Sequence, residues 1–124
     1  MIEDYFLTIE KVLQDFPTIR SRALAQKVYN HHQGYHSGKI VFENGYSLEF
    51  IEVVDTEQQE KVKYRYHYMD EKQALIFRYD NAPHHKEVKT FPHHKHIPEE
   101  VTTSQEPDLH TVLMEITHYH RGER

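Results

Sequence analysis

Two short runs in residues 62–80 alternate strictly between two kinds of side chain. In VKYRYHYM, residues 62–69, Val62 and the tyrosines at every second position are separated by Lys63, Arg65, His67 and Met69. ALIFRYD, residues 74–80, spaces Leu75, Phe77 and Tyr79 in the same way. Because successive side chains of a strand point to opposite faces, the two runs predict an antiparallel hairpin with one buried and one solvent-facing side.

The polar residues between the two runs determine how these strands pair. A two- or four-residue loop sets Tyr66 opposite Phe77 on the buried face and Arg65 opposite Arg78 on the other. Two arginines directly opposite each other repel, which costs stability unless an anion lies between them. In the ordinary alternative, both side chains simply extend into water.

A second hairpin is predicted by SGKIVFENGYSLEFIEVV, residues 37–54. A three-residue loop at 43–45 pairs Ile40 with Leu48 and Gly38 with Phe50, so that all the large apolar side chains share one face. A two-residue turn would mix apolar and polar side chains on each face. The register therefore follows burial, and Gly45 is expected in the left-handed conformation of a bulged turn.

Two helices are expected, one near each end of the chain. Residues 2–16 show the apolar spacing of an amphipathic helix that Pro17 ends, and Pro107 and Asp108 open a second helix with an apolar stripe from Leu109 to Ile116. Residues 22–32 are ambiguous and favour a strand, 97–107 indicate a loop, and the polar tail from His118 is expected to fray. These elements predict one α+β domain over 1–124, in which an antiparallel sheet of four to five strands packs as a two-layer domain against the N- and C-terminal helices.

Composition excludes several classes of site and location. The chain has no cysteine, so neither disulfides nor thiolate zinc sites can form. No apolar run approaches the ~18 residues of a membrane span, and the start MIEDYFLTIE is acidic, unlike a signal peptide. We therefore expect a cytoplasmic protein without a membrane partner.

Charge is unevenly distributed along the chain. The formal net charge is −5 with all twelve histidines counted as neutral. The stretch from Lys61 to His96 nevertheless carries eight Lys and Arg against four Asp and Glu, together with six histidines. A polyanion that binds this protein is therefore expected to bind within that stretch.

The segment NAPHHKEVKTFPHHKH, residues 81–96, concentrates five histidines. His94 and His96 share one side of an extended chain, and with His84 or His85 folded back they could ligate zinc. This reading is the less favoured one, because no HExxH motif or paired aspartates accompany it. Proton transfer on a phosphodiester suits histidine near neutral pH, and a solvated histidine-rich loop is the plain alternative. The residues alone leave these last two readings open.

Longer blocks of the same region resemble a known family. YRYHYMDEKQALIFRYDNAPHHKEVKTFPHHKHI, followed by EPDLHTVLMEI, is similar to the TumE-type toxins of toxin–antitoxin pairs over about residues 35–118. The resemblance implies a toxin whose partner is a small, DNA-binding antitoxin, and ribonuclease activity is expected by analogy with other small toxins. It singles out motif positions that include His67, Arg78, Asp80, Asn81, His84, His85, His93, His94, Lys95 and His96.

Together these observations predict a metal-independent endoribonuclease with RNA as substrate and no cofactor. We expect His85 and either His94 or His96 to form the acid–base pair, with Asp80 orienting one imidazole and His67 on the same sheet face. Arg65, Arg78 and Lys95 are expected to bind phosphate. The alternatives are a non-enzymatic module that binds nucleic acid or antitoxin, and a hydrolase that uses a histidine-bound metal. The sequence leaves open whether two copies form a homodimer.

Overall fold

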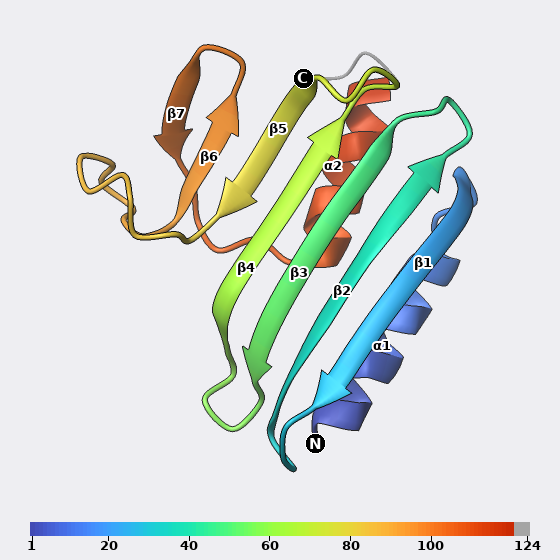
Figure 1. Ribbon diagram of the computed structural model, residues 1–124, viewed down its shortest axis with the longest axis vertical. Helices are drawn as coiled ribbons and strands as arrows, with labels where there is room; N and C mark the ends of the chain where they lie inside the picture. Colours follow the sequence, from blue (N-terminus) through green and yellow to red (C-terminus); the bar gives the residue numbers. More distant parts are fainter. Residues whose placement is uncertain (121–124) are drawn as a thin grey trace.

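The computed structural model describes residues 1–120, apart from the side chain of Glu60, and contains two helices and one antiparallel sheet (Figure 1). The strands follow one another in the sheet in the order in which they occur in the chain. The elements are α1 (Ile2–Gln14), β1 (Ile19–Val28), β2 (Gln33–Phe42), β3 (Ser47–Asp55), β4 (Glu60–Met69), β5 (Leu75–Asp80), β6 (His94–Ile97), β7 (Glu100–Thr103) and α2 (Leu109–His120).

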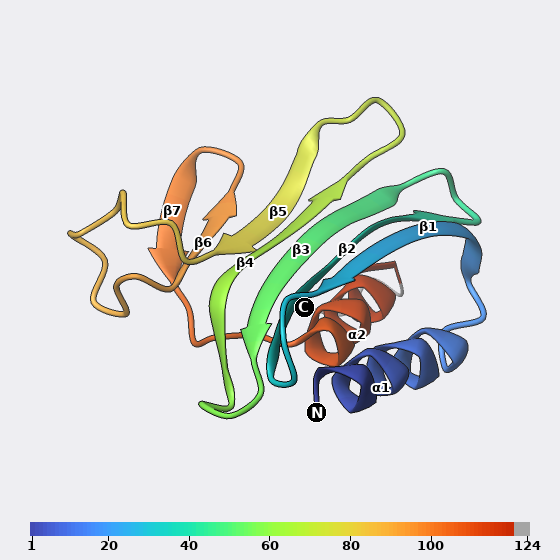
Figure 2. The ribbon, with the colours of Figure 1, turned by 60° about the horizontal axis from the view of Figure 1, so that its bottom comes forward.

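Both helices cover the same face of the sheet, so the fold is a two-layer α+β arrangement as predicted (Figure 2). The apolar stripes of α1 and α2 pack on side chains from every second position of the central strands. This core includes Ile9, Leu13, Ile40, Phe42, Leu48, Phe50, Tyr66, Phe77, Leu113 and Ile116. The other face, called here the open face, is covered by neither of the two helices of residues 1–120. No helix in residues 1–120 is long and apolar enough to cross a membrane.

The β2–β3 hairpin has the register predicted from burial. Ile40 lies opposite Leu48 and Gly38 opposite Phe50. The amide N–H of Phe42 donates to the carbonyl oxygen of Tyr46 at 2.9 Å, which closes the three-residue loop. Gly45 has a φ of +88°, a conformation that glycine adopts without the steric penalty of a Cβ atom.

The β4–β5 hairpin has the predicted faces but not the predicted register. Arg65 lies opposite Asp80, and Arg78 lies opposite His67, so the predicted opposition of two arginines is wrong. The pairing is shifted by two residues from the predicted one. The register is irregular between Tyr68 and Met69, and the amide N–H of Asp70 donates to the carbonyl oxygen of Ala74 to close the turn. Because side chains alternate with a period of two, this shift leaves the same side chains buried.

The sheet has seven strands, where four to five were expected. The additional strands include β6 and β7, which have four residues each and lie where the sequence indicated a histidine-rich connection and an acidic loop. Such short polar strands carry no apolar alternation that could reveal them. The ambiguous segment 22–32 belongs largely to β1, and residues 118–120 lie in α2. The rest of the tail that was expected to fray, 121–124, lies outside the described residues.

Candidate functional site

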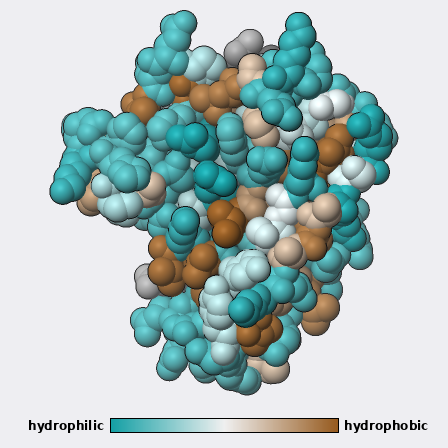
Figure 3. Space-filling view, in the orientation of Figure 1, coloured by the Kyte–Doolittle hydropathy of each residue, from teal (hydrophilic) through white to brown (hydrophobic). Residues whose placement is uncertain are grey.

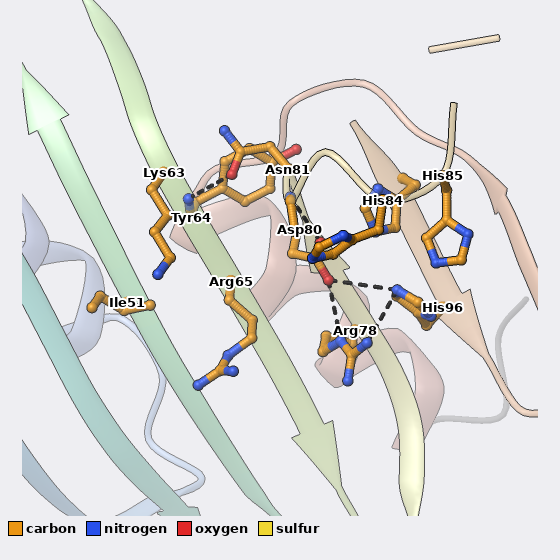
Figure 4. Close-up of a pocket in the computed structure, with 12 residues that line it drawn as sticks. Ile51, Lys63, Tyr64, Arg65, Arg78, Asp80, Asn81, His84, His85 and His96 are labelled. Carbon is orange, nitrogen blue, oxygen red and sulfur yellow. Dashed lines mark hydrogen bonds and ion pairs between the residues drawn. The ribbon is translucent and has the colours of Figure 1, made fainter. Parts of the chain in front are cut away.

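A cleft of about 370 Å³ opens on the open face, where β4, β5 and β6 meet the loop at 81–93 (Figure 4). Titratable side chains dominate its lining. The lining residues are Ile51, Lys63, Tyr64, Arg65, Arg78, Asp80, Asn81, Ala82, His84, His85, His94 and His96. Most of the residues that the sequence singled out therefore meet at one place.

Pairing of β5 with β6 brings four of these residues together. Arg78 lies opposite His96, and Asp80 lies opposite His94, so all four side chains project from the open face. The loop after β5 returns His85 to this group. Its first turn is held by the amide of Ala82, which donates to Oδ1 of Asp80 at 3.0 Å. The rings of His85, His94 and His96 then lie with centroids 4.9 to 5.3 Å apart.

His94 is buried and hydrogen-bonded through both ring nitrogens. Its Nδ1 lies 2.9 Å from the carbonyl oxygen of Pro92, and its Nε2 lies 2.8 Å from Oδ1 of Asp80. The carbonyl oxygen of Pro92 only accepts, so Nδ1 of His94 donates to it, and Nε2 shares a hydrogen bond with Asp80. With both nitrogens engaged, His94 is suited to hold Asp80 in place.

His96 has the opposite hydrogen-bonding role. Its Nε2 lies 3.1 Å from Nη2 of Arg78, and a guanidinium only donates, so this nitrogen is the acceptor. Nε of Arg78 in turn donates to Oδ2 of Asp80 at 3.2 Å (Figure 4). Burial, and next the charge of Arg78, lower the pKa of His96 below its usual value. Nε2 of His96 also lies 3.5 Å from Oδ2 of Asp80, so it faces both a cation and a carboxylate, and the lowered pKa favours the neutral imidazole.

His85 is partly exposed, and its ring is held by Glu87, which does not line the cleft. Its Nδ1 lies 3.1 Å from Oε1 of Glu87. The pKa of the Glu87 carboxyl is lowered by a hydrogen bond from its own backbone amide and next by that from His85, which keeps it ionised. The contact engages Nδ1 and orients the ring of His85.

The model of the family described as Toxin TumE matches residues 9–120 of this chain. The chain belongs to the TumE toxin family. The resemblance predicted from the histidine-containing blocks is therefore confirmed, and the family suggests a toxin of a toxin–antitoxin system with an antitoxin as partner. No curated protein and no solved structure was found to match the chain.

In this TumE family member, two of the motif residues point away from the cleft. Nζ of Lys95 lies 2.7 Å from Oε2 of Glu115 on α2 and about 5 Å from the ring of Tyr79, on the helix-covered face. His93 stacks on Tyr64 and bonds its hydroxyl at 2.7 Å. Neighbours in a strand face opposite ways, so Lys95 does not join Arg65 and Arg78 as the sequence predicted.

The remaining cations of the TumE site come from β4. Arg65 and Lys63 are exposed and line the cleft, and Arg65 lies opposite Asp80. His67 lies opposite Arg78 at the edge of the site, where burial and then the charges of Arg78 and Arg65 lower its pKa. Sequence reasoning did not select Lys63, although the alternation in VKYRYHYM already puts it on the face of Arg65.

The histidines of the TumE site also have the spacing of metal ligands. One nitrogen from each of His85, His94 and His96 lies within 4.8 Å of the others. A transition metal there would have to displace Asp80 or Pro92 from His94 and Arg78 from His96, next to a permanent cation. Metal binding would therefore require these hydrogen bonds to be exchanged.

Proposed function

We propose that this TumE toxin cleaves RNA by metal-independent acid–base catalysis in the cleft at β4–β6. The observation that carries the proposal is the contact between Arg78 and His96, which sets a neutral imidazole nitrogen 3.1 Å from a guanidinium. Cleavage of RNA needs a base and a cation side by side, because the attacking hydroxyl loses its proton as charge builds on the phosphate. Arg65 and Lys63 add positive charge to the same cleft.

In the proposed mechanism, a bound phosphate first competes for the Arg78 guanidinium. Once Arg78 turns toward the phosphate, Nε2 of His96 accepts the proton of the adjacent 2′-hydroxyl. The 2′-oxygen attacks phosphorus, the bond to the 5′-oxygen breaks, and Nε2 of His85 gives that oxygen a proton. The products are a 2′,3′-cyclic phosphate and a 5′-hydroxyl, with one proton gained by His96 and one lost by His85.

Asp80 and His94 have a positioning role in this proposal. Asp80 accepts hydrogen bonds from Arg78, His94 and the amide of Ala82, so it links β5, β6 and the loop that carries His85. His67, beside Arg78, adds a second neutral imidazole at the edge of the site.

A metal-dependent hydrolase is the second candidate, and the three nitrogens within 4.8 Å favour it. A binding module that never cuts is the third. Incubating labelled RNA with the purified protein in excess EDTA separates the three. The proposed enzyme keeps its activity, the metal enzyme loses it and regains it with zinc, and the module cleaves under neither condition.

We further propose that a cognate, DNA-binding antitoxin holds the toxin inactive and that the toxin acts in the cytoplasm. Expression of the toxin alone should then arrest growth. Co-expression of the antitoxin, or the substitution Arg78→Ala in the toxin, should restore it. Normal growth with folded wild-type protein present would contradict this proposal.

A further inference from the structure

Two rows of side chains cross the open face from the histidine cluster to the far edge strand. In each row, every strand from β1 to β6 contributes one residue, which lies directly opposite its neighbours in the row. The first row runs through His94, Asp80, Arg65, Ile51, Ser37 and Ala25, and the second runs through His96, Arg78, His67, Glu49, Lys39 and Ala23. The catalytic cleft is therefore one end of a surface that extends over β1 to β6.

A second, shallower cleft of about 430 Å³ occupies the other end of these rows. Its lining includes Ile51 and Arg65, which also line the first cleft, so the two hollows adjoin on β3 and β4. The rest of its lining includes the small residues Ala23, Ala25 and Ser37, and the pair Lys39 and Glu49, which lie opposite each other on β2 and β3. From β5 to β1 the surface spans roughly 19 Å, at about 4.8 Å for each interstrand step.

The chemistry of this second cleft suits a nucleotide. Lys39 is exposed beside the small residues, and Ile51 offers an apolar contact at the junction. Figure 3 shows this face in the orientation of Figure 1, with brown and pale residues between hydrophilic ones. Surfaces that bind single-stranded nucleic acid combine cations along the backbone with aromatic side chains on which bases stack. Here Lys39 and Arg65 are the cations, and the aliphatic Ile51 takes the place of a stacking ring.

We propose that the second cleft is a subsite for a nucleotide that flanks the cleaved bond of a single-stranded RNA. The proposal rests on the function proposed above, because the RNA is oriented by its scissile phosphate at Arg78. A single strand is required, since only unpaired bases can turn onto the floor formed by Ala23, Ala25 and Ser37. Lys39 and Arg65 then contact the backbone on either side of Ile51.

Adjacent residues of β1 provide a matched pair of variants for the test. Ala25 lies opposite Ser37 on the open face, whereas Gln26 lies opposite the buried His36 on the helix-covered face. Both residues are exposed, so Ala25→Glu and Gln26→Glu each add one negative charge to the same strand. Only Ala25→Glu puts that charge into the second cleft. The unfolding free energy of each variant is measured in urea to confirm that both fold.

The experiment measures binding and cleavage separately. Binding uses fluorescence anisotropy with labelled, random-sequence RNA eight nucleotides long that 2′-O-methyl groups protect from cleavage, as a single strand and as a duplex. Cleavage uses the unmodified RNA and a mixture of dinucleotides, which are too short to reach the second cleft. Ala25→Glu should weaken binding of the single strand by about tenfold or more, because its carboxylate fills the floor and repels the phosphates of the strand.

For cleavage, Ala25→Glu should lower kcat/KM for the octamer by a similar factor and leave it unchanged for the dinucleotides. Gln26→Glu should match wild type in both assays, and the duplex should bind more weakly than the single strand. Equal octamer binding by the two variants, or no single-strand binding by wild type, would overturn the subsite. If Ala25→Glu weakens RNA binding but the wild type cleaves no RNA, the subsite stands and the catalytic function is overturned. If an antitoxin displaces the labelled RNA but unlabelled RNA does not, the face belongs to a protein partner, and the subsite is overturned.

Discussion

The imidazole of His94 and the carboxylate of Asp80 form a buried pair beneath the proposed active site. Nε2 of His94 lies 2.8 Å from Oδ1 of Asp80, and the two residues are 1% and 6% exposed. Asp80 also accepts a hydrogen bond from Arg78, so one carboxylate holds both the Arg78 guanidinium and β6, the strand that carries His94. Catalytic geometry and stability are therefore coupled at this residue.

Removal of Asp80 should destabilise the protein strongly. Asp80→Ala removes the buried acceptor that Arg78, His94 and the amide of Ala82 share, and leaving a buried donor unsatisfied costs about 1–3 kcal/mol. The free energy of unfolding in urea measures the loss. As a control, alanine at the exposed Glu100 on β7 should change it by less than about 0.5 kcal/mol. Equal stability of the two variants would contradict the pairing of His94 with Asp80.

Glu52 predicts a dependence of stability on pH. This carboxyl is fully buried and accepts hydrogen bonds from the hydroxyls of Tyr5 and Tyr66, and burial raises its pKa above the usual value. The folded state thus binds the proton more tightly than the unfolded state does. The stability contribution of Glu52 is fully present below its unfolded pKa of about 4.5 and declines as pH rises above it.

The comparison of wild type with Glu52→Gln isolates this effect, because glutamine has the same shape and does not titrate. The difference in unfolding free energy should shift in favour of Glu52→Gln as pH increases from about 4 to 7. Urea unfolding at several pH values provides the measurement. A difference that stays constant over this range would show that Glu52 has the same pKa in both states.

Gly45 should resist substitution by a β-branched residue. Its φ of +88° is costly for side chains other than glycine, so Gly45→Val should lower the unfolding free energy by about 1–3 kcal/mol. Gly45→Asn is the matched comparison, since asparagine adopts positive φ more readily. It should cost less than valine in the same urea titration. A valine variant as stable as wild type would contradict the bulged turn.

Arg78 and Lys95 should differ in their effect on RNA cleavage. Arg78 faces His96 in the cleft, whereas Lys95 pairs with Glu115 on the other side of the sheet. Arg78→Ala should raise KM and lower kcat, because its charge acts on both the bound and the transition state. Lys95→Ala should leave both constants close to wild type. Steady-state kinetics at low and high salt tests this, and a dominant effect of Lys95 would contradict the proposed site.

Burial explains which parts of the fold the sequence could predict. The β2–β3 register follows from a single arrangement that gathers Ile40, Phe42, Leu48 and Phe50 on one face. The β4–β5 register does not, because a shift of two residues preserves the same buried set. Strands β6 and β7 lack apolar alternation. Strand β6 is defined by pairing with β5, which lies far away in the chain, and β7 by pairing with β6.

The site was predictable to the extent that alternation assigns residues to faces. It grouped Arg65 and His67 with Arg78, and the histidine-rich segment 81–96, together with the family resemblance, pointed to His85, His94 and His96. The different roles of the histidines depend on their partners, which the sequence does not specify. Asp80 and Pro92 occupy both nitrogens of His94, whereas Arg78 leaves His96 neutral. The face of Lys95 could be assigned only once residues 94–97 were known to be a strand.

The central claim is that His96 and His85 transfer protons on an RNA substrate without metal. The most direct test is the pH profile of RNA cleavage in excess EDTA for wild type and for His85→Ala/His96→Ala. Wild type should show a bell-shaped profile whose acidic limb lies below the histidine reference of about 6.5, because burial and Arg78 lower the pKa of His96. The double variant should bind RNA but lose at least about 10²-fold in kcat, and both limbs with it. Cleavage by the double variant at the wild-type rate, or loss of wild-type activity in EDTA, would contradict the claim.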